Sequence, residues 1–139
     1  MYKPRWFETH ELVYPLIWAA RGDRALELMD ERILITADQL RDKFGKITVN
    51  NYEWGGQYKE SGLRSFTTQT GAKLSQHRFG RGLDMKFGQT TPQEVYDYIL
   101  NSPEDFEYIT CVENIEATKT WLHIDCRTLQ TGGIRVINP

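Results

Sequence analysis

The sequence has few of the residues that mark specialised classes of small protein. With two cysteines in 139 residues, it has no framework of several disulfides, and the separation of Cys111 and Cys126 is not that of zinc-finger ligands. No apolar run reaches the roughly 20 residues needed to span a bilayer. Residues 1–6 show neither the apolar segment nor the cleavage site of a secretory signal, so we expect synthesis in the cytoplasm.

An excess of charge of one sign is also missing. The 17 Lys and Arg residues face 19 Asp and Glu residues, for a formal net charge of −2, whereas a nucleic-acid-binding face normally carries a basic excess. We therefore expect no nucleic-acid partner. Apolar residues make up 40% and charged residues 26%, which excludes disorder and collagen-like repeats. The length suits one domain over residues 1–139.

The first third of the chain carries helical patterns. The expected helices are Glu11–Ala20, which starts after a Thr9 cap or at Pro15; Asp23–Ile33, capped by Asp23; and Leu40–Phe44, capped within Thr36–Gln39 and stopped at Gly45. Further on, Thr91–Glu94 has the form of a capping box with proline at the first helical position, and it predicts a helix over residues 92–101.

The rest of the chain alternates between a long loop and short β-prone segments. Residues 54–76 are rich in Gly, Ser, Thr and Gln and read as irregular, and loops of this length are usually functional. The β-prone segments are Lys46–Tyr52, Leu83–Phe87, Tyr108–Val112, Trp121–Arg127 and Ile134–Ile137. Helices first and strands later indicate an α+β domain, with N-terminal helices packed on a mainly antiparallel sheet.

Two of the three histidines, His77 and His123, lie in segments that also contain an aspartate, Asp84 and Asp125. Gly80 and Gly82 allow a tight bend between His77 and Asp84. In a strand over residues 121–127, alternation places His123 on one face together with Trp121, Asp125 and Arg127. Two imidazoles and one carboxylate are a common ligand set for catalytic zinc, which leaves one position for water. From spacing alone, the alternative is a surface turn held by side-chain hydrogen bonds. The remaining histidine, His10, is expected to be exposed.

Three motifs, in this order, resemble a known enzyme family. They are Ser61-Gly62-Leu63-Arg64-Ser65, Ser75-x-His77-x-x-Gly80-x-x-x-Asp84 and Trp121-x-His123-x-Asp125. Together they are similar to the D-alanyl-D-alanine carboxypeptidases of the hedgehog/DD-peptidase superfamily of zinc peptidases, in particular to small, often phage-encoded members. The resemblance covers roughly residues 30–127 and implies the fold of that superfamily.

The resemblance also implies the activity and the ligands. It makes His77, Asp84 and His123 the ligands of one zinc ion. The implied substrate is a peptidoglycan stem peptide cut next to a D-amino acid, by a carboxypeptidase or an endolysin-like enzyme that acts at the bacterial cell wall. Arg64 would bind a substrate carboxylate, which a guanidinium pairs with bidentately; the alternative is a surface salt bridge.

Other residues near the motifs have two readings each. Ser75 either supports the site or stabilises a turn. Trp121 either walls the site or packs in the core. Tyr52 and Trp54, with the two glycines that follow, either line the cleft, since sugars and peptides often lie on aromatic rings, or pack locally. Cys111 and Cys126 are most simply explained as small apolar core residues.

One position departs from the family pattern. Many of these peptidases carry the general base three residues before the last histidine, where this chain has Thr120. Threonine cannot take a proton from water at neutral pH, so Glu113, Asp125 or neither must act as the base. Asp125 has the alternative role of supporting His123 or pairing with Arg127. The departure leaves a second hypothesis, a catalytically silent cell-wall-binding or phage structural module, and a third, a zinc hydrolase of a different amide.

Overall fold

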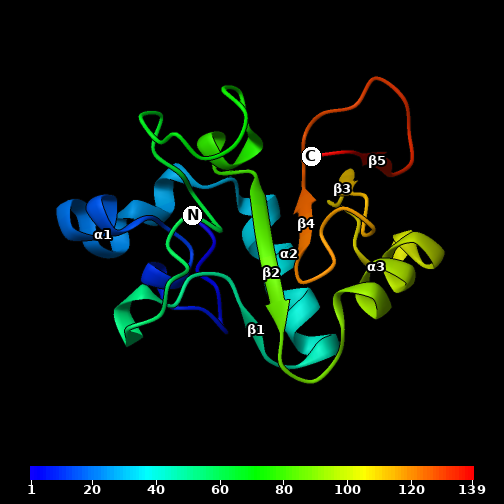
Figure 1. The fold of residues 1–139 in the computed structure, drawn as a ribbon, viewed down its shortest axis with the longest axis horizontal. Helices are drawn as coiled ribbons and strands as arrows, with labels where there is room; N and C mark the ends of the chain where they lie inside the picture. Colours follow the sequence, from blue (N-terminus) through cyan, green and yellow to red (C-terminus); the bar gives the residue numbers. More distant parts are fainter.

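The computed structural model describes residues 1–139 and contains three α-helices and five β-strands (Figure 1). The helices are α1 (Pro15–Arg21), α2 (Glu31–Phe44) and α3 (Pro92–Asn101). The strands are β1 (Ile47–Thr48), β2 (Gly82–Phe87), β3 (Cys111–Glu113), β4 (Leu122–Asp125) and β5 (Arg135–Ile137). The expected α+β class is confirmed. None of the helices has both the length and the apolar character needed to cross a membrane.

The five strands form one sheet in the order β1-β2-β4-β3-β5. The pairings β1–β2, β2–β4 and β3–β4 are antiparallel, whereas β5 runs parallel to β3. The sheet is therefore mainly antiparallel, as expected, but it is mixed because of the one parallel pair. The reason lies in the long connection after β4, which arcs away from the sheet in Figure 1 and returns the chain in the direction of β3. An alternating pattern marks a strand but not the direction in which it pairs.

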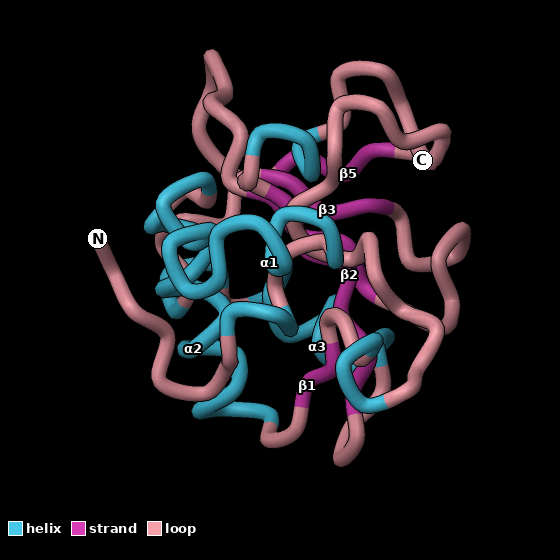
Figure 2. Tube along the Cα trace, turned by 90° about the vertical axis from the view of Figure 1, so that its left-hand side faces the viewer, coloured by secondary structure: helices cyan, strands magenta, loops and turns pink.

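One face of the central strands belongs to the hydrophobic core. The apolar side chains of β2 and β4 and the apolar stripe of α2 are fully buried: Leu83, Met85, Leu122, Ile124, Ile33, Leu34, Ala37 and Leu40. Helix α2 lies behind β2 and β4 in Figure 1, and the turned view shows the helices gathered on one side of the sheet (Figure 2). This packing leaves the opposite face of β2 and β4 free to carry polar side chains.

The N-terminal helices differ from those expected. Pro15 starts α1, and Thr9 lies in a separate 3₁₀ turn, Thr9–Glu11. The segment expected to be a helix capped by Asp23 is a 3₁₀ helix, Gly22–Leu28. The cap expected within Thr36–Gln39 is wrong, because these residues lie inside α2, where the Thr36 hydroxyl donates to the Arg32 carbonyl at 2.7 Å.

Other boundaries are closer to expectation. Helix α2 ends at Gly45, whose φ of 78° favours glycine. The side chain of Thr91 caps α3 by accepting from the Glu94 N–H at 3.1 Å, and Pro92 is the first helical residue. The β-prone segment Lys46–Tyr52 contains only the short β1, and a 3₁₀ turn, Tyr52–Trp54, follows it.

Candidate metal centre

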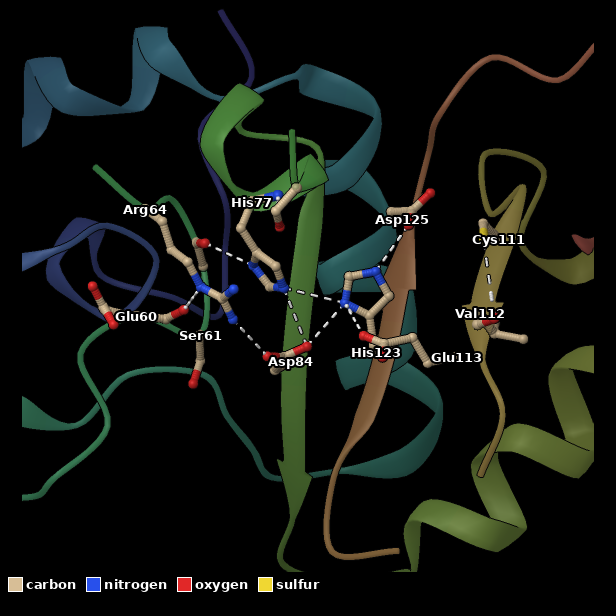
Figure 3. A network of polar contacts seen from close by, with 12 residues as sticks. Glu60, Ser61, Arg64, His77, Asp84, Cys111, Val112, Glu113, His123 and Asp125 are labelled. Carbon is tan, nitrogen blue, oxygen red and sulfur yellow. Dashed lines mark hydrogen bonds and ion pairs between the residues drawn. The ribbon is translucent and has the colours of Figure 1, made fainter. Parts of the chain in front are cut away.

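The site is built where two neighbouring strands bring distant parts of the chain together. Asp84 of β2 lies directly opposite His123 of β4 in the antiparallel register. His77 comes from the 3₁₀ turn Gln76–Phe79, immediately before β2, and that turn ends at Gly80 with φ 66°. A Cβ at Gly82 would lie 3.1 Å from Cε1 of His123, a tight contact, so glycine lets the imidazole lie close to the backbone of β2. The side chains of His77, Asp84 and His123 point toward one another (Figure 3).

The three donor atoms form a small triangle. His77 Nε2 lies 3.2 Å from Asp84 Oδ1 and 3.1 Å from His123 Nδ1, and His123 Nδ1 lies 2.9 Å from Asp84 Oδ1. Tetrahedral coordination with bonds of about 2.0–2.1 Å separates neighbouring ligand atoms by about 3.3–3.4 Å. The triangle has nearly this size, so the cluster could hold a metal ion.

The hydrogen bonds of the outer ring nitrogens support the same conclusion. His77 Nδ1 lies 2.9 Å from the carbonyl oxygen of Gly62, which only accepts, so this nitrogen carries the proton. His123 Nε2 lies 2.8 Å from Asp125 Oδ2 and donates to it. In the neutral rings, the lone pairs of His77 Nε2 and His123 Nδ1 then face each other and the Asp84 carboxylate. Lone pairs that converge in a buried place repel one another unless a proton or a metal cation lies between them, so a metal ion that binds here takes the place of a proton.

The ionisation of the cluster follows from its burial and contacts. Burial lowers the pKa of His77. Burial also acts to lower the pKa of His123, but the hydrogen bonds to Asp125 and Asp84 outweigh it and raise this pKa to about 9. For Asp84, burial alone would raise the pKa, and the two adjacent imidazoles more than offset this and hold it well below its usual value. Asp84 is thus a carboxylate at neutral pH, as a metal ligand must be.

Asp125 is a support for His123. Its Oδ1 accepts from the Nε of Arg127 at 2.8 Å, and its Oδ2 accepts from Arg127 Nη2 at 2.6 Å as well as from His123. The side chain is fully buried. Burial acts to raise the pKa of Asp125, but the Arg127 and His123 contacts overcome it and lower the pKa to about 2. Both carboxylate oxygens are therefore engaged on the side of His123 that faces away from Asp84.

Glu113 occupies the other side of the same imidazole. Strand β3 lies beside β4 and brings Glu113 Oε1 to 3.3 Å from His123 Nδ1, the nitrogen that faces the cluster (Figure 3). Burial raises the pKa of this carboxyl. Thr120, by contrast, is exposed in the turn before β4. A carboxylate on the side of His123 that faces the cluster thus comes from the neighbouring strand, and not from the position where the family pattern carries it.

Arg64 ties the loop before the site to Asp84. Its Nη2 donates to Asp84 Oδ2 at 3.1 Å, and its Nε donates to the Glu60 carbonyl at 2.6 Å. The Asp84 N–H donates to the carbonyl of Ser61 at 2.7 Å, so the Ser61–Ser65 segment holds the strand as well as the side chain. Arg64 is buried in this ion pair, unlike an ordinary surface salt bridge.

A cavity opens onto the cluster. Its volume is about 280 Å³, and its lining includes Arg64, Ser75, His77, Glu113, His123 and Arg127. Ser75 caps the turn of His77 by accepting from the His77 N–H at 3.3 Å. The cavity therefore presents one carboxylate and two guanidinium groups around the two imidazoles, and each guanidinium is paired with an aspartate, Arg64 with Asp84 and Arg127 with Asp125.

Several residues singled out in the sequence lie elsewhere. Trp121 precedes β4, is half-buried and does not line the cavity. Tyr52 and Trp54 do not line it either; the Tyr52 hydroxyl donates to the Val13 carbonyl at 2.8 Å. His10 is half-buried, contrary to expectation, because the long loop after β1 brings Trp54 against it. The two cysteines are buried and not bridged.

Lys86 was not anticipated from the sequence. Its Nζ donates to the Val49 carbonyl at 2.7 Å and to the Ser61 hydroxyl at 2.9 Å, and burial lowers its pKa to about 8. Lys86 thereby ties strand β2 both to Val49, which follows β1, and to Ser61 at the start of the Ser61–Ser65 loop. The sequence pattern could have indicated its position, since period-two alternation puts Lys86 on the same face of β2 as Asp84.

Comparison with known proteins returned no family model, curated protein or solved structure that matches this chain.

Proposed function

We propose that this chain is a zinc-dependent peptidase that hydrolyses peptide bonds next to D-amino acids in peptidoglycan stem peptides, and that it acts at the bacterial cell wall. The observation that carries the proposal is the buried triangle of His77, Asp84 and His123 with the Glu113 carboxylate beside it, at the floor of an open cavity. The order of the three sequence motifs supplies the substrate class.

The donor set favours zinc as the metal. Two neutral imidazoles and one carboxylate are typical of catalytic zinc sites, whereas sites for magnesium or calcium consist mainly of oxygen ligands. When bound, zinc would lower the pKa of a water molecule and polarise the carbonyl group of the scissile bond. The protein itself contributes the fixed orientation of the ligands, through the Gly62 carbonyl behind His77 and Asp125 behind His123.

Glu113 is the proposed general base. It takes the proton of the attacking water and passes it to the leaving amine, which requires a carboxylate within reach of the cluster. Asp125 is less suited, because Arg127 and His123 engage both of its oxygens. The burial that raises the pKa of Glu113 suits a group that must accept a proton and release it again.

Arg64 is the proposed binding residue for a substrate carboxylate. It lines the cavity, and its Nη1 has no hydrogen-bond partner within the protein. The Nη2 of the same guanidinium is already held by Asp84, so the group is fixed in place before a substrate arrives.

The test uses zinc-loaded protein and purified sacculi, and it measures newly released amino groups together with the zinc content. We expect release by the unchanged protein. Glu113→Gln should keep its zinc and lose about 10²–10⁴ in rate, whereas His77→Ala should lose both zinc and cleavage. The matched control is Glu116→Gln, which changes an exposed carboxylate three residues along the same connection.

The same assay tests the rival hypotheses. Binding to sacculi without release of amino groups would overturn the peptidase and favour a silent cell-wall-binding module. Full activity of Glu113→Gln would remove Glu113 as the base. Release from an amide substrate without D-amino acids, and none from sacculi, would favour a zinc hydrolase of another amide.

A further inference from the structure

A second hollow lies apart from the metal centre. It has a volume of about 560 Å³ and shares no lining residue with the cavity of the candidate site. Its walls come from the N-terminal segment, the last turn of α2, β1 and the turn Tyr52–Trp54, and they include Trp6 and Trp54. We call this hollow the tryptophan groove. Nothing in the proposed peptidase reaction uses it.

The two indoles of the groove are exposed and yet held in place. Trp54 is 65% exposed, and the ring of His10 meets it edge-on at 5.1 Å. His10 in turn packs against Trp18 at 5.5 Å, which anchors it to α1. Large aromatic rings that stay exposed in fixed positions lose little entropy when a ligand covers them.

Trp6 is held in place by contacts with α2. It is 46% exposed, and its Nε1 donates to Asp42 Oδ1 at 2.7 Å. The guanidinium of Arg41 lies over the Trp6 ring at 5.4 Å from the centroid. The groove therefore has an oriented ring from each of two segments that are distant in the sequence.

Several polar groups in the lining of the groove lack partners within the protein. The Lys46 ammonium, the Thr48 hydroxyl and the Trp54 Nε1 line the groove and make no intramolecular hydrogen bond. The side chain of Asn51 uses only its oxygen, which accepts from the Tyr58 N–H at 2.9 Å. The charged side chains of the lining are one carboxylate, Glu11, and two cations, Arg41 and Lys46. The groove therefore offers both hydrogen-bond donors and hydrogen-bond acceptors to a ligand, and its lining contains charges of both signs.

We propose that the tryptophan groove binds a neutral carbohydrate chain. A sugar ring has an apolar face of C–H groups that fits an indole, and a rim of hydroxyls that both donate and accept hydrogen bonds. The groove offers this combination, because two held indoles and several unpartnered polar groups line it. A wholly apolar ligand would leave the polar groups without partners. The site is independent of the metal centre, and in a peptidoglycan hydrolase it would hold the glycan strand.

The experiment follows the four indole N–H signals by ¹H–¹⁵N NMR during titration with the tetrasaccharide of N-acetylglucosamine and, separately, with cellotetraose. We expect the Trp6 and Trp54 signals to shift with at least one sugar, and the Trp18 and Trp121 signals to stay in place. Trp54→Ala should weaken binding by about tenfold or more. Phe66→Ala, which removes an aromatic ring that is 62% exposed and outside the groove, should bind as the unchanged protein does.

The outcomes separate this proposal from the peptidase. The shifts should persist after chelation of metal and in His77→Ala, so a failed peptidase assay does not affect them. If neither sugar shifts the Trp6 and Trp54 signals up to about 10 mM, the proposal that the groove binds carbohydrate is wrong. Unchanged sugar binding by a folded Trp54→Ala variant would also contradict it. Equal shifts with a free stem peptide would also overturn it and assign the groove to peptide.

Discussion

Asp125 shows how much of the site depends on a residue that does not face the metal position. Its two oxygens accept from the side chain and backbone N–H of Arg127 and from His123 Nε2. Because a carboxylate can only accept here, His123 must donate through Nε2 and present Nδ1 to the cluster. One buried carboxylate thus selects the ring nitrogen that is available as a ligand.

At this scale we predict that Asp125→Asn weakens zinc binding by about 10- to 100-fold. The amide has one acceptor oxygen in place of two, and it cannot balance both Arg127 and a polarised imidazole. Competition with a chelator of known affinity measures the change. Asp97→Asn, an exposed change on α3, is the control. Equal zinc affinity for the folded Asp125→Asn variant would show that His123 needs no such support.

Helix α2 shows the same dependence on distant contacts at the scale of an element. The sequence predicted two separate helices, Asp23–Ile33 and Leu40–Phe44, because Thr36–Gln39 resembles a cap. The structure has one helix across this segment. The Asp38 carboxylate instead accepts from the Tyr2 hydroxyl and from the backbone N–H groups of Arg5 and Trp6. Asp38, a polar residue in the middle of α2, thus anchors the N-terminal segment, and no local sequence pattern reveals this role.

The true start of α2 gives a stability prediction. Asp30 accepts from the Arg32 N–H at 3.0 Å and forms an ion pair with the Arg32 guanidinium at 2.7 Å. Asp30→Ala leaves the first helical N–H groups without this cap, so it should reduce the free energy of unfolding by about 1 kcal/mol. Urea denaturation measures the loss. Glu107→Ala, an exposed change outside the helix, should have no such effect, and an equally small effect of Asp30→Ala would argue against the cap.

For the whole molecule, the metal centre joins parts of the chain that are far apart. His77 lies before β2, Asp84 lies within β2 and His123 lies within β4, so a bound cation would link a loop to both central strands. Ligand binding to the folded state alone stabilises it by mass action.

We predict that zinc at about 100 times its dissociation constant adds about 2.7 kcal/mol and raises the melting temperature by about 10 °C. Thermal unfolding with zinc, and after removal of zinc by a chelator, measures this difference. His77→Ala lacks one ligand and should show little or no shift. A melting temperature that zinc leaves unchanged in the parent protein would contradict a site formed by the folded chain.

The sequence by itself determined the α+β class, the approximate positions of most strands and the α3 cap, and it indicated the three residues of the cluster, whose role as ligands the family resemblance implied. These features depend on local chemistry, such as alternation, capping side chains and the restricted set of residues that bind metals. The spacing of His77, Asp84 and His123 was therefore informative before any coordinates were considered.

Only the tertiary structure decided how these parts meet. It paired β5 in parallel with β3, brought Glu113 to His123 from a neighbouring strand while Thr120 stayed exposed, and placed Trp54 in a separate groove. Each of these depends on the direction and register of strands or on the path of a long loop. Such contacts join residues distant in the sequence, so no local pattern encodes them.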